Sequence, residues 1–205
     1  MSTKFPSIGV LDIQGSVEEH LTALRRCGVN PVSVKNAEDL ARVDGLIIPG
    51  GESTTIGKLL KKYGLDKEIK RRARHPTSHI LTIWGTCAGA ILLAKKILNQ
   101  RPDSLSLMNV EISRNAYGRQ LDSFETLLAI PSLEIKDFPA VFIRAPRVKR
   151  AFKKAKVLAE YNGEPVMVEE ENLLITTFHP ELTGDIRIHK YFLELTRKYA
   201  RQSSK

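Results

Sequence analysis

The residue with the clearest potential for chemistry is Cys87, because of the residues that surround it. It lies between Gly85 and Gly89 in the segment Gly-Thr-Cys-Ala-Gly, after an apolar run over residues 80–84 and before a helical apolar pattern over residues 90–94. A strand, a tight turn and a helix in this order are typical of a nucleophile elbow, in which a strained turn holds a reactive side chain exposed. We expect Gly85 and Gly89 to remove side chains that would clash at this turn. The helix that follows would favour the thiolate, the reactive form, through the positive end of its dipole.

A cysteine nucleophile needs a base, and His179 is the best candidate among the five histidines. A predicted buried strand over residues 173–177 delivers it to the edge of the sheet, and Pro180 favours an extended backbone. Because residues two apart in an extended chain point the same way, we expect Glu181 to orient the His179 ring. These residues predict a Cys-His-Glu relay of nucleophile, base and orienter. The other histidines show no partner pattern, and we predict surface or helix-capping positions for His20, His75, His79 and His189.

Hydrolysis of an amide also needs hydrogen-bond donors for the oxyanion that develops. The first expected donor is the N–H of Ala88, the residue after the nucleophile. The glycine-rich segment over residues 49–55, Pro-Gly-Gly-Glu-Ser-Thr-Thr, offers the second at Gly51, since glycines allow a close approach of the backbone. The alternative for this segment is a plain turn in which Ser53 or Thr54 caps a helix. A phosphate-binding loop is disfavoured because the Walker lysine is absent.

Each part of the predicted site has a structural alternative. A cysteine at an apolar strand–helix junction is usually a small core residue, and His-Pro-Glu can simply end a strand. The combination of Cys87 with residues 179–181 at two strand ends of one chain is much more specific than either part. We expect Cys27 to be a packing residue near a helix end. No His, Cys, Asp or Glu cluster has the spacing of metal ligands, so we predict neither a metal nor another cofactor.

Strand and helix patterns alternate through the first half of the chain, which predicts a parallel sheet with right-handed crossovers. Strands are expected over residues 7–14, 31–34, 45–48 and 80–84, and helices over residues 17–27, from 54 or 55 to 63, and 65–74. The second half is richer in strands, expected over residues 110–113, 140–143, 156–161, 165–168 and 173–177, before a final helix over residues 185–199. Asn162 and Gly163 predict a hairpin turn. We therefore predict one α/β domain over residues 1–205, a three-layer, flavodoxin-like sandwich with a mostly parallel central sheet.

Composition limits the class of protein further. The chain has 205 residues, of which 42% are hydrophobic and 27% charged, as in an ordinary globular domain. Two cysteines, no long apolar segment and no pattern of a signal peptide predict a soluble protein of the reducing cytoplasm, with no membrane association. The net charge is +9, with basic runs over residues 67–74 and 147–156. We interpret these runs as solvated helix faces or a contact with an acidic protein; aromatic residues do not alternate with them, which disfavours nucleic acid.

Six segments, in order along the chain, resemble a known family. They are residues 9–15 (Gly-Val-Leu-Asp-Ile-Gln-Gly), 49–55, 85–89, 114–120 (Arg-Asn-Ala-Tyr-Gly-Arg-Gln), 142–146 (Phe-Ile-Arg-Ala-Pro) and 178–181 (Phe-His-Pro-Glu). Together they resemble the glutaminase subunits of pyridoxal 5′-phosphate synthase, which are triad, or class I, glutamine amidotransferases. The elbow and His-Pro-Glu mark the wider class, whereas the segments 49–55, 114–120 and 142–146 point to this family.

The resemblance implies glutamine hydrolysis, with the ammonia passed to a partner synthase subunit in a large hetero-oligomer. It implies a triad of Cys87, His179 and Glu181, and a glutamine pocket lined by Gly51, Glu52, Ser53, Arg114, Ile143 and Arg144. It places Gln14 and Gly50 near the site or the partner surface, and it implies that the partner completes the loop at Gly50 and Gly51. Two positions depart from the family pattern, namely Asn109, where aspartate is expected, and Asp12, in a strand that is usually more apolar.

Three alternatives remain at this level. The first is a glutaminase that serves another synthase, and the second is a related hydrolase with a cysteine elbow. The third is a non-catalytic binding scaffold, in which nothing depends on Cys87. One-domain length favours the glutaminase, because no second domain remains to consume ammonia.

Overall fold

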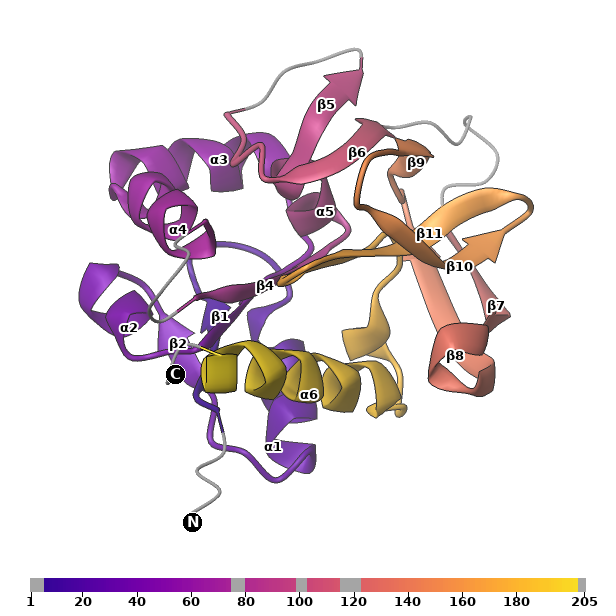
Figure 1. Cartoon of the computed structure of the whole chain (residues 1–205), viewed down its shortest axis with the longest axis horizontal. Coiled ribbons are helices and arrows are strands. Elements are labelled where there is room, and N and C mark those ends of the chain that lie inside the picture. Colours follow the sequence, from indigo (N-terminus) through magenta and orange to yellow (C-terminus); the bar gives the residue numbers. More distant parts are fainter. Residues whose placement is uncertain (1–5, 75–79, 99–102, 115–122, 203–205) are drawn as a thin grey trace.

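The centre of the molecule is a seven-stranded sheet (Figure 1). The computed structural model describes residues 6–74, 80–98, 103–114 and 123–202. The strands are β1 (Ile8–Leu11), β2 (Val32–Val34), β3 (Gly45–Ile48), β4 (Thr82–Thr86), β10 (Lys156–Tyr161), β11 (Glu164–Glu170) and β12 (Leu173–Thr176). Their order is β10-β11-β12-β4-β3-β1-β2. All neighbours from β12 to β2 are parallel, whereas β10, β11 and β12 pair antiparallel, so the predicted mostly parallel sheet is confirmed.

Helices cover both faces of this sheet, which gives the three predicted layers (Figure 1). On one face lie α3 (Ser53–Lys62), α4 (Leu65–Ala73) and α5 (Ala88–Leu93), and on the other lie α1 (Val17–Arg26) and α6 (Arg187–Gln202). Strand side chains alternate between two apolar cores: Leu46 and Ile48 join the first, and Ile47 the second. Strands buried on both faces explain the continuous apolar runs in the sequence.

Two smaller sheets accompany the central one. The first contains β5 (Ala94–Leu98), β6 (Met108–Ser113) and β9 (Arg147–Ala151), and the second is the hairpin of β7 (Ser123–Ile130) and β8 (Ile135–Ile143). The sequence predictions missed β5, β7 and β9, and also the short helix α2 (Ala37–Ala41). The interpretation of the basic run 147–156 as a helix face is wrong, because β9 pairs antiparallel with β6 there. The predicted turn at Asn162 and Gly163 is confirmed, since both have positive φ between the antiparallel strands β10 and β11.

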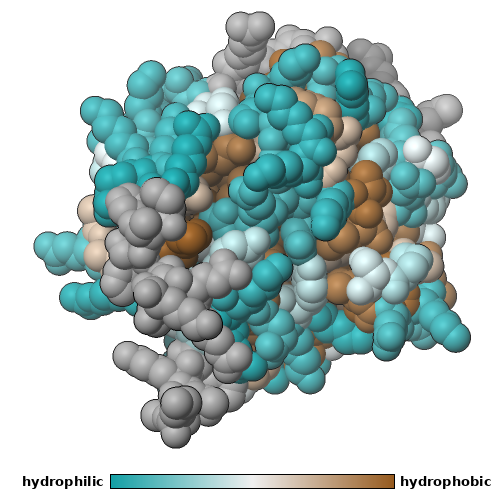
Figure 2. Space-filling model, viewed as in Figure 1, coloured by the Kyte–Doolittle hydropathy of each residue, from teal (hydrophilic) through white to brown (hydrophobic). Residues whose placement is uncertain are grey.

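The second basic run, over residues 67–74, lies on α4 as predicted, but it is not wholly solvated. Arg72 is buried and donates from its two terminal nitrogens to the backbone oxygens of Leu40, at 2.5 Å, and Val43, at 2.7 Å. This arginine therefore joins α4 to the end of α2 and to the segment that follows it. The face drawn in Figure 2 is mainly hydrophilic, with separate apolar patches. No helix among the described residues is long and apolar enough to cross a membrane.

The carboxyl ends of the parallel strands gather the segments that were predicted to carry chemistry. Residues 12–14 follow β1, residues 49–52 follow β3, Cys87 follows β4, and residues 177–181 follow β12. Because these strands are parallel neighbours, their carboxyl ends meet at one edge, where sheets of this kind hold their sites.

Candidate active site

Cys87 occupies a strained turn between β4 and α5. Its backbone angles are φ 46° and ψ −99°, outside the regions that a side chain normally allows. A Cβ at Gly85 would lie 2.5 Å from the backbone of Gly89, and a Cβ at Gly89 would lie 2.1 Å from the Ile48 oxygen. The expected reason for both glycines is therefore confirmed. The N–H of Cys87 donates to the Thr176 oxygen at 2.9 Å, which fixes the turn against β12.

His179 and Glu181 meet as predicted. His179 Nδ1 lies 2.7 Å from Glu181 Oε1, and the Glu181 side chain is completely buried. The backbone that brings them together differs from the prediction. A 3₁₀ turn, η2 (Pro180–Leu182), follows His179 in place of an extended segment. The N–H of His179 donates to the Val141 oxygen of β8 at 2.8 Å, so the hairpin β7–β8 also positions this residue.

The environment of His179 strongly favours its charged form. Burial opposes the charge, but hydrogen bonds to Cys87 and Glu181 and their negative charges outweigh it, and they raise the pKa of His179 to about 10. Burial likewise opposes a charged Glu181, yet the neighbouring His20 and His179 lower the pKa of its carboxyl. Since Nδ1 is engaged with Glu181, Nε2 is the nitrogen left to face Cys87. A cysteine beside a charged imidazole is the arrangement that cysteine nucleophiles use.

Cys87 is buried, contrary to the exposed position expected for the elbow, but it lines one cavity of about 360 Å³ together with His179. Its lining brings together nine of the predicted site residues: Gly51, Glu52, Ser53, Cys87, Ala88, Arg114, Ile143, Arg144 and His179. Ser16, Ile91 and Leu182 complete it. Glu181 is not part of this lining and contacts the cavity only through His179.

Gly50 and Gln14, the remaining predicted residues, hold the glycine-rich loop in place. The Gly50 oxygen accepts from the Ser16 N–H at 3.0 Å, and Gln14 Oε1 accepts from the Glu52 N–H at 2.8 Å. A Cβ at Gly50 would lie 2.4 Å from the His179 ring, so only glycine fits there. Because the peptide between Gly50 and Gly51 is trans, the Gly51 N–H points away from Ser16.

Glu52 caps helix α3, a role that the sequence alternative assigned wrongly to Ser53 or Thr54. Its carboxylate accepts from the N–H groups of Thr54, at 3.0 Å, and Thr55, at 2.7 Å. Burial opposes the charge of Glu52, but these hydrogen bonds outweigh it and lower its pKa to about 2. Arg114 pairs with the same carboxylate at 3.2 Å, which presents its guanidinium at the cavity wall. The continuation of that motif, residues 115–120, lies outside the described residues.

Ile143 and Arg144 form the opposite wall, at the end of β8. The Ile143 oxygen lies 3.9 Å from Cys87 Sγ. Arg144 has φ 44°, a left-handed backbone that is uncommon for arginine. Strain at a residue that lines a cavity is typical of a functional position.

The prediction of surface positions for His20 and His189 is wrong. Both side chains are completely buried next to Glu181: His20 Nε2 lies 3.4 Å from Glu181 Oε2 and 3.2 Å from Thr86 Oγ1, and His20 Nδ1 lies 3.1 Å from His189 Nε2. A signal was present, since His20 falls on the apolar stripe of its helix, three residues after Val17. His75 and His79 lie outside the described residues.

The remaining predictions concern residues away from the cavity. Cys27 packs against the second core, as expected. At the first family departure, Asn109 donates its N–H to Glu170 Oε2 at 2.5 Å, and Lys95 donates to Asn109 Oδ1 at 2.7 Å. At the second, Asp12 accepts from Ser33 at 2.6 Å and pairs with a lysine at the sheet edge. Among the described residues, no group of three or more His, Cys, Asp or Glu side chains could hold a metal ion.

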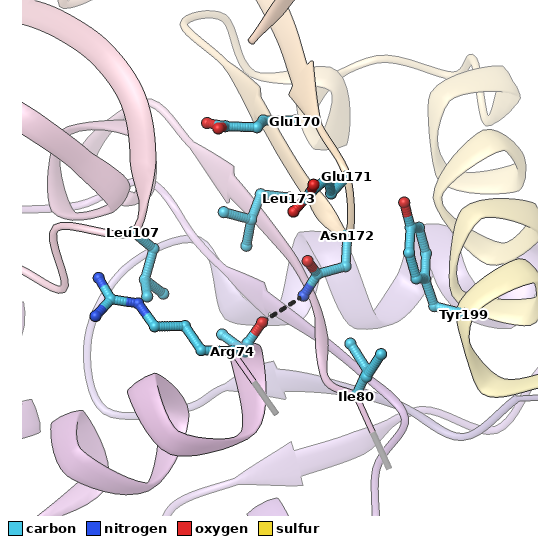
Figure 3. Close-up of a pocket in the computed structure, with 9 residues that line it drawn as sticks. Arg74, Ile80, Leu107, Glu170, Glu171, Asn172, Leu173 and Tyr199 are labelled. Atoms are coloured by element: carbon cyan, nitrogen blue, oxygen red, sulfur yellow. Dashed lines mark hydrogen bonds between the residues drawn. The ribbon is translucent and has the colours of Figure 1, made fainter. Parts of the chain in front are cut away.

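A second cavity, of about 400 Å³, lies at the amino ends of β4 and β12, opposite the first (Figure 3). Its polar side chains are engaged within the protein. Asn172 donates to the oxygens of Ala73, at 3.1 Å, and Leu81, at 2.7 Å, and Arg74 donates to the Ser106 oxygen. The Asn172 amide points at the end of α4 rather than into open space (Figure 3). Glu171, which has φ 56°, forms the turn between β11 and β12, and its carboxylate pairs with Lys154.

Fold and site together define the class of glutamine amidotransferases. A crystal structure of a glutamine amidotransferase, 44% identical in sequence, matches the chain with a TM-score of 0.87 and covers 92% of this chain and 98% of that one. The crystal structure of another glutamine amidotransferase, from Thermotoga maritima, is only 13% identical. It has a TM-score of 0.59, covers 98% of this chain and 93% of that one, and supports the fold alone.

The chain belongs to the SNO glutamine amidotransferase family, whose model matches residues 10–198. It is 48% identical over 190 residues to pyridoxal 5′-phosphate synthase subunit PdxT from Thermotoga maritima, which covers 93% of this chain and 99% of the relative. It is 50% identical over 195 residues to the protein of the same name from Dehalococcoides mccartyi, which covers 94% and 98%.

Proposed function

We propose that this protein hydrolyses L-glutamine to L-glutamate and ammonia, and that it supplies the ammonia to the synthase subunit of pyridoxal 5′-phosphate synthase. The observation that carries the proposal is the strained Cys87, which shares a cavity with a His179 ring held by Glu181. Relatives named as subunits of that synthase, at about half identity over nearly their whole length, support the choice of acceptor.

In the first half of the reaction, the Cys87 thiolate attacks the carbon of the glutamine carboxamide. A carbon–sulfur bond forms and the carbon–nitrogen bond breaks, while the His179 imidazolium gives its proton to the departing ammonia. In the second half, His179 takes a proton from water, which attacks the thioester and releases glutamate and the thiolate. Glu181 keeps the imidazole in one orientation through both halves.

Two backbone N–H groups are positioned to stabilise the oxyanion. Ala88 is the first residue of α5, so its N–H has no acceptor within the helix and lines the cavity directly after the nucleophile. The Gly51 N–H points away from Ser16 and supplies the second donor. One such donor is worth about 3 kcal/mol of the barrier. A synthase partner that adjusts the peptide between Gly50 and Gly51 would therefore switch the activity on.

The cavity wall suits a free amino acid. Arg114 and Arg144 offer cations for the α-carboxylate, and the Glu52 carboxylate, ionised at neutral pH, offers a partner for the α-ammonium. Gly51, Ser53 and Ile143 complete the contacts. Ammonia released in open water would be protonated, so we place the synthase subunit over this cavity, with Gln14 near that contact.

The compartment follows from the thiols. Both cysteines are free, which is typical of proteins in a reducing compartment, so we place the reaction in the cytoplasm. A scaffold role without catalysis is disfavoured because it leaves the strain at Cys87 without a purpose.

The test is the release of glutamate from glutamine, measured with and without the synthase subunit. We expect Cys87→Ala to abolish release and Cys27→Ala, at the other free thiol, to retain it. Synthases of other pathways, used as partners, separate this proposal from a glutaminase with a different acceptor. Undiminished activity of Cys87→Ala would eliminate the proposed chemistry.

A further inference from the structure

Two buried histidines continue the polar chain beyond Glu181. His20 comes from α1 and His189 from α6, the two helices on one face of the sheet, and neither side chain reaches solvent. Glu181 Oε1 is engaged with His179. Glu181 Oε2 has no hydrogen bond of ordinary geometry within the described part of the chain, and His20 Nε2 is the nitrogen that faces it, at 3.4 Å. A buried carboxylate oxygen without a donor is costly, so the protonation of His20 decides how well Glu181 is stabilised.

The contacts favour one arrangement of protons. If His20 carried its proton on Nδ1 alone, the Nε2 lone pair would face the Glu181 carboxylate, which is repulsive. A proton on Nε2 is instead donated to Thr86 Oγ1, at 3.2 Å, and places the positive edge of the ring 3.4 Å from Glu181 Oε2. Nδ1 then accepts from His189 Nε2 at 3.1 Å, and the Nδ1 of His189 is left as a bare lone pair. Among the described residues that atom has no hydrogen-bond partner, which is tolerable for a lone pair and costly for an N–H.

Both histidines are held neutral by their surroundings. Burial lowers the pKa of His20, opposed chiefly by the charge of Glu181 and, further away, by Glu19, and supported by His179. Burial also lowers the pKa of His189, to about 3, with Arg26 acting in the same direction and Glu181 against it. Neutral rings with fixed tautomers can orient a carboxylate without competing with His179 for its charge.

We propose that His20 is a positioning residue for glutamine hydrolysis: its Nε2–H, hydrogen-bonded to Thr86, lies beside the outer oxygen of Glu181 and keeps that carboxylate aimed at His179 by electrostatic attraction, while His189 fixes the tautomer of His20. The proposal rests on the proposed function for its effect on rate, but its proton arrangement is independent of any activity. With these contacts, the chain of polar side chains that begins at the cavity continues from Glu181 to His20 on α1 and His189 on α6.

The first test observes the protons directly in the wild-type chain. Nitrogen-15 NMR of histidine-labelled protein distinguishes the two neutral tautomers and the charged ring. We expect His20 and His189 both to be neutral with the proton on Nε2 between pH 6 and 8. A proton on Nδ1 of His20, or a charged His20 ring, would overturn the proposal whether or not the protein hydrolyses glutamine.

The second test measures how glutamate release by the complex with the synthase depends on pH. His20→Leu removes the donor, whereas the amide of His20→Gln can place an N–H near the position of Nε2. We expect His20→Leu to lower kcat roughly 10- to 100-fold, as loss of an orienting partner typically does, with little change in KM. A carboxylate without this support has a higher pKa, so we expect the acid limb of the pH profile of His20→Leu to move to higher pH. We expect His20→Gln to recover both the kcat and the acid limb of the wild type.

A matched control separates positioning from packing. Phe192→Leu trims a ring that packs against Trp84, as His189 does, without touching Glu181. It should lower stability and leave the pH profile in place. Equal kcat and an unshifted acid limb in folded His20→Leu contradict the proposal, as does an equal loss in His20→Gln and His20→Leu. An inactive wild-type complex contradicts the proposed function instead, and the NMR result still decides the role of His20.

Discussion

The two ends of the central sheet hold cavities of similar volume, about 360 and 400 Å³, with opposite physical character. At the carboxyl end, Cys87 and Arg144 have strained backbones, and His179 is held charged in a buried place. At the amino end, Asn172 satisfies two backbone oxygens, and Glu170 is bound by Asn109. Volume therefore does not locate the chemistry. A positive φ alone does not locate it either, because Glu171, in the turn between β11 and β12 at the amino end, has φ 56°. Of the two cavities, the one at the carboxyl end combines a strained cysteine with a buried histidine whose pKa is raised to about 10, a combination typical of a functional site.

The most severe test of the difference between the two ends removes the charge of Glu181 at the carboxyl end. Glu181→Gln keeps the size of the side chain but removes the charge that stabilises the His179 imidazolium. We expect kcat to fall by roughly 10⁴-fold, as when the carboxylate of a similar triad is neutralised. Steady-state glutamate release by the complex measures this, with unchanged circular dichroism as the control for folding. A loss below roughly 10-fold would mean that Glu181 does not orient the base.

The amino end should respond in the opposite way, in stability rather than in rate. Asn172→Leu leaves the oxygens of Ala73 and Leu81 buried without their donor, which costs about 2–4 kcal/mol of unfolding free energy. We expect kcat and KM of the folded fraction to remain those of the wild type. Urea unfolding and glutamate release measure the two effects, and Glu171→Gln, an exposed change at the same cavity, is the matched control. A selective loss of activity in Asn172→Leu would move the functional site to this end.

Gly50, the glycine beside the His179 ring, offers a smaller and sharper test of the carboxyl end. Gly50→Ala adds a methyl group 2.4 Å from the His179 ring, which cannot retreat because Glu181 holds it. A displacement of about 1 Å in a catalytic group costs on the order of 100-fold in rate. Gly184→Ala, where an added Cβ would contact nothing, should change neither rate nor stability. Equal rates for the two variants would show that the close approach at Gly50 is irrelevant.

The parts of this molecule that the sequence predicted best are those whose cause is local. The elbow at Cys87 requires glycines two residues away on each side, and the pairing of His179 with Glu181 spans two residues. Parallel strands are recognisable as apolar runs because both faces are buried. Helix α2 also had a local signal that was overlooked, since Asn36 accepts from the Asp39 N–H as an N-cap.

The parts that failed depend on distant partners. His20 and Glu181 are separated by 161 positions, and nothing near His20 reveals the carboxylate that it faces. Strand β9 resembles a charged surface segment because its exposed residues are basic, and only its pairing with β6 makes it a strand. The cap of α3 was misassigned because serine and threonine are commoner caps, whereas Glu52 also pairs with Arg114, 62 positions away.

The smallest expected effect is a loss of unfolding free energy in acid that arises from the buried histidines. The pKa of His189 is about 3 in the folded chain and about 6.5 when unfolded, so between these values the unfolded state binds a proton that the folded state refuses. Stability is therefore lost as pH falls through this window, by about 2 kcal/mol between pH 7 and pH 5 for one group. His20 acts in the same direction, whereas His179, with its pKa raised to about 10, is protonated in the folded state throughout and gains no proton there. We expect His189→Phe to reduce the difference between urea midpoints at pH 7 and pH 5, while Phe192→Leu lowers both midpoints equally. If His189→Phe loses as much stability in acid as the wild type, the His189 ring does not stay neutral in the folded chain. The tautomer of His20 at the carboxyl end of the sheet is then not fixed by a neutral His189.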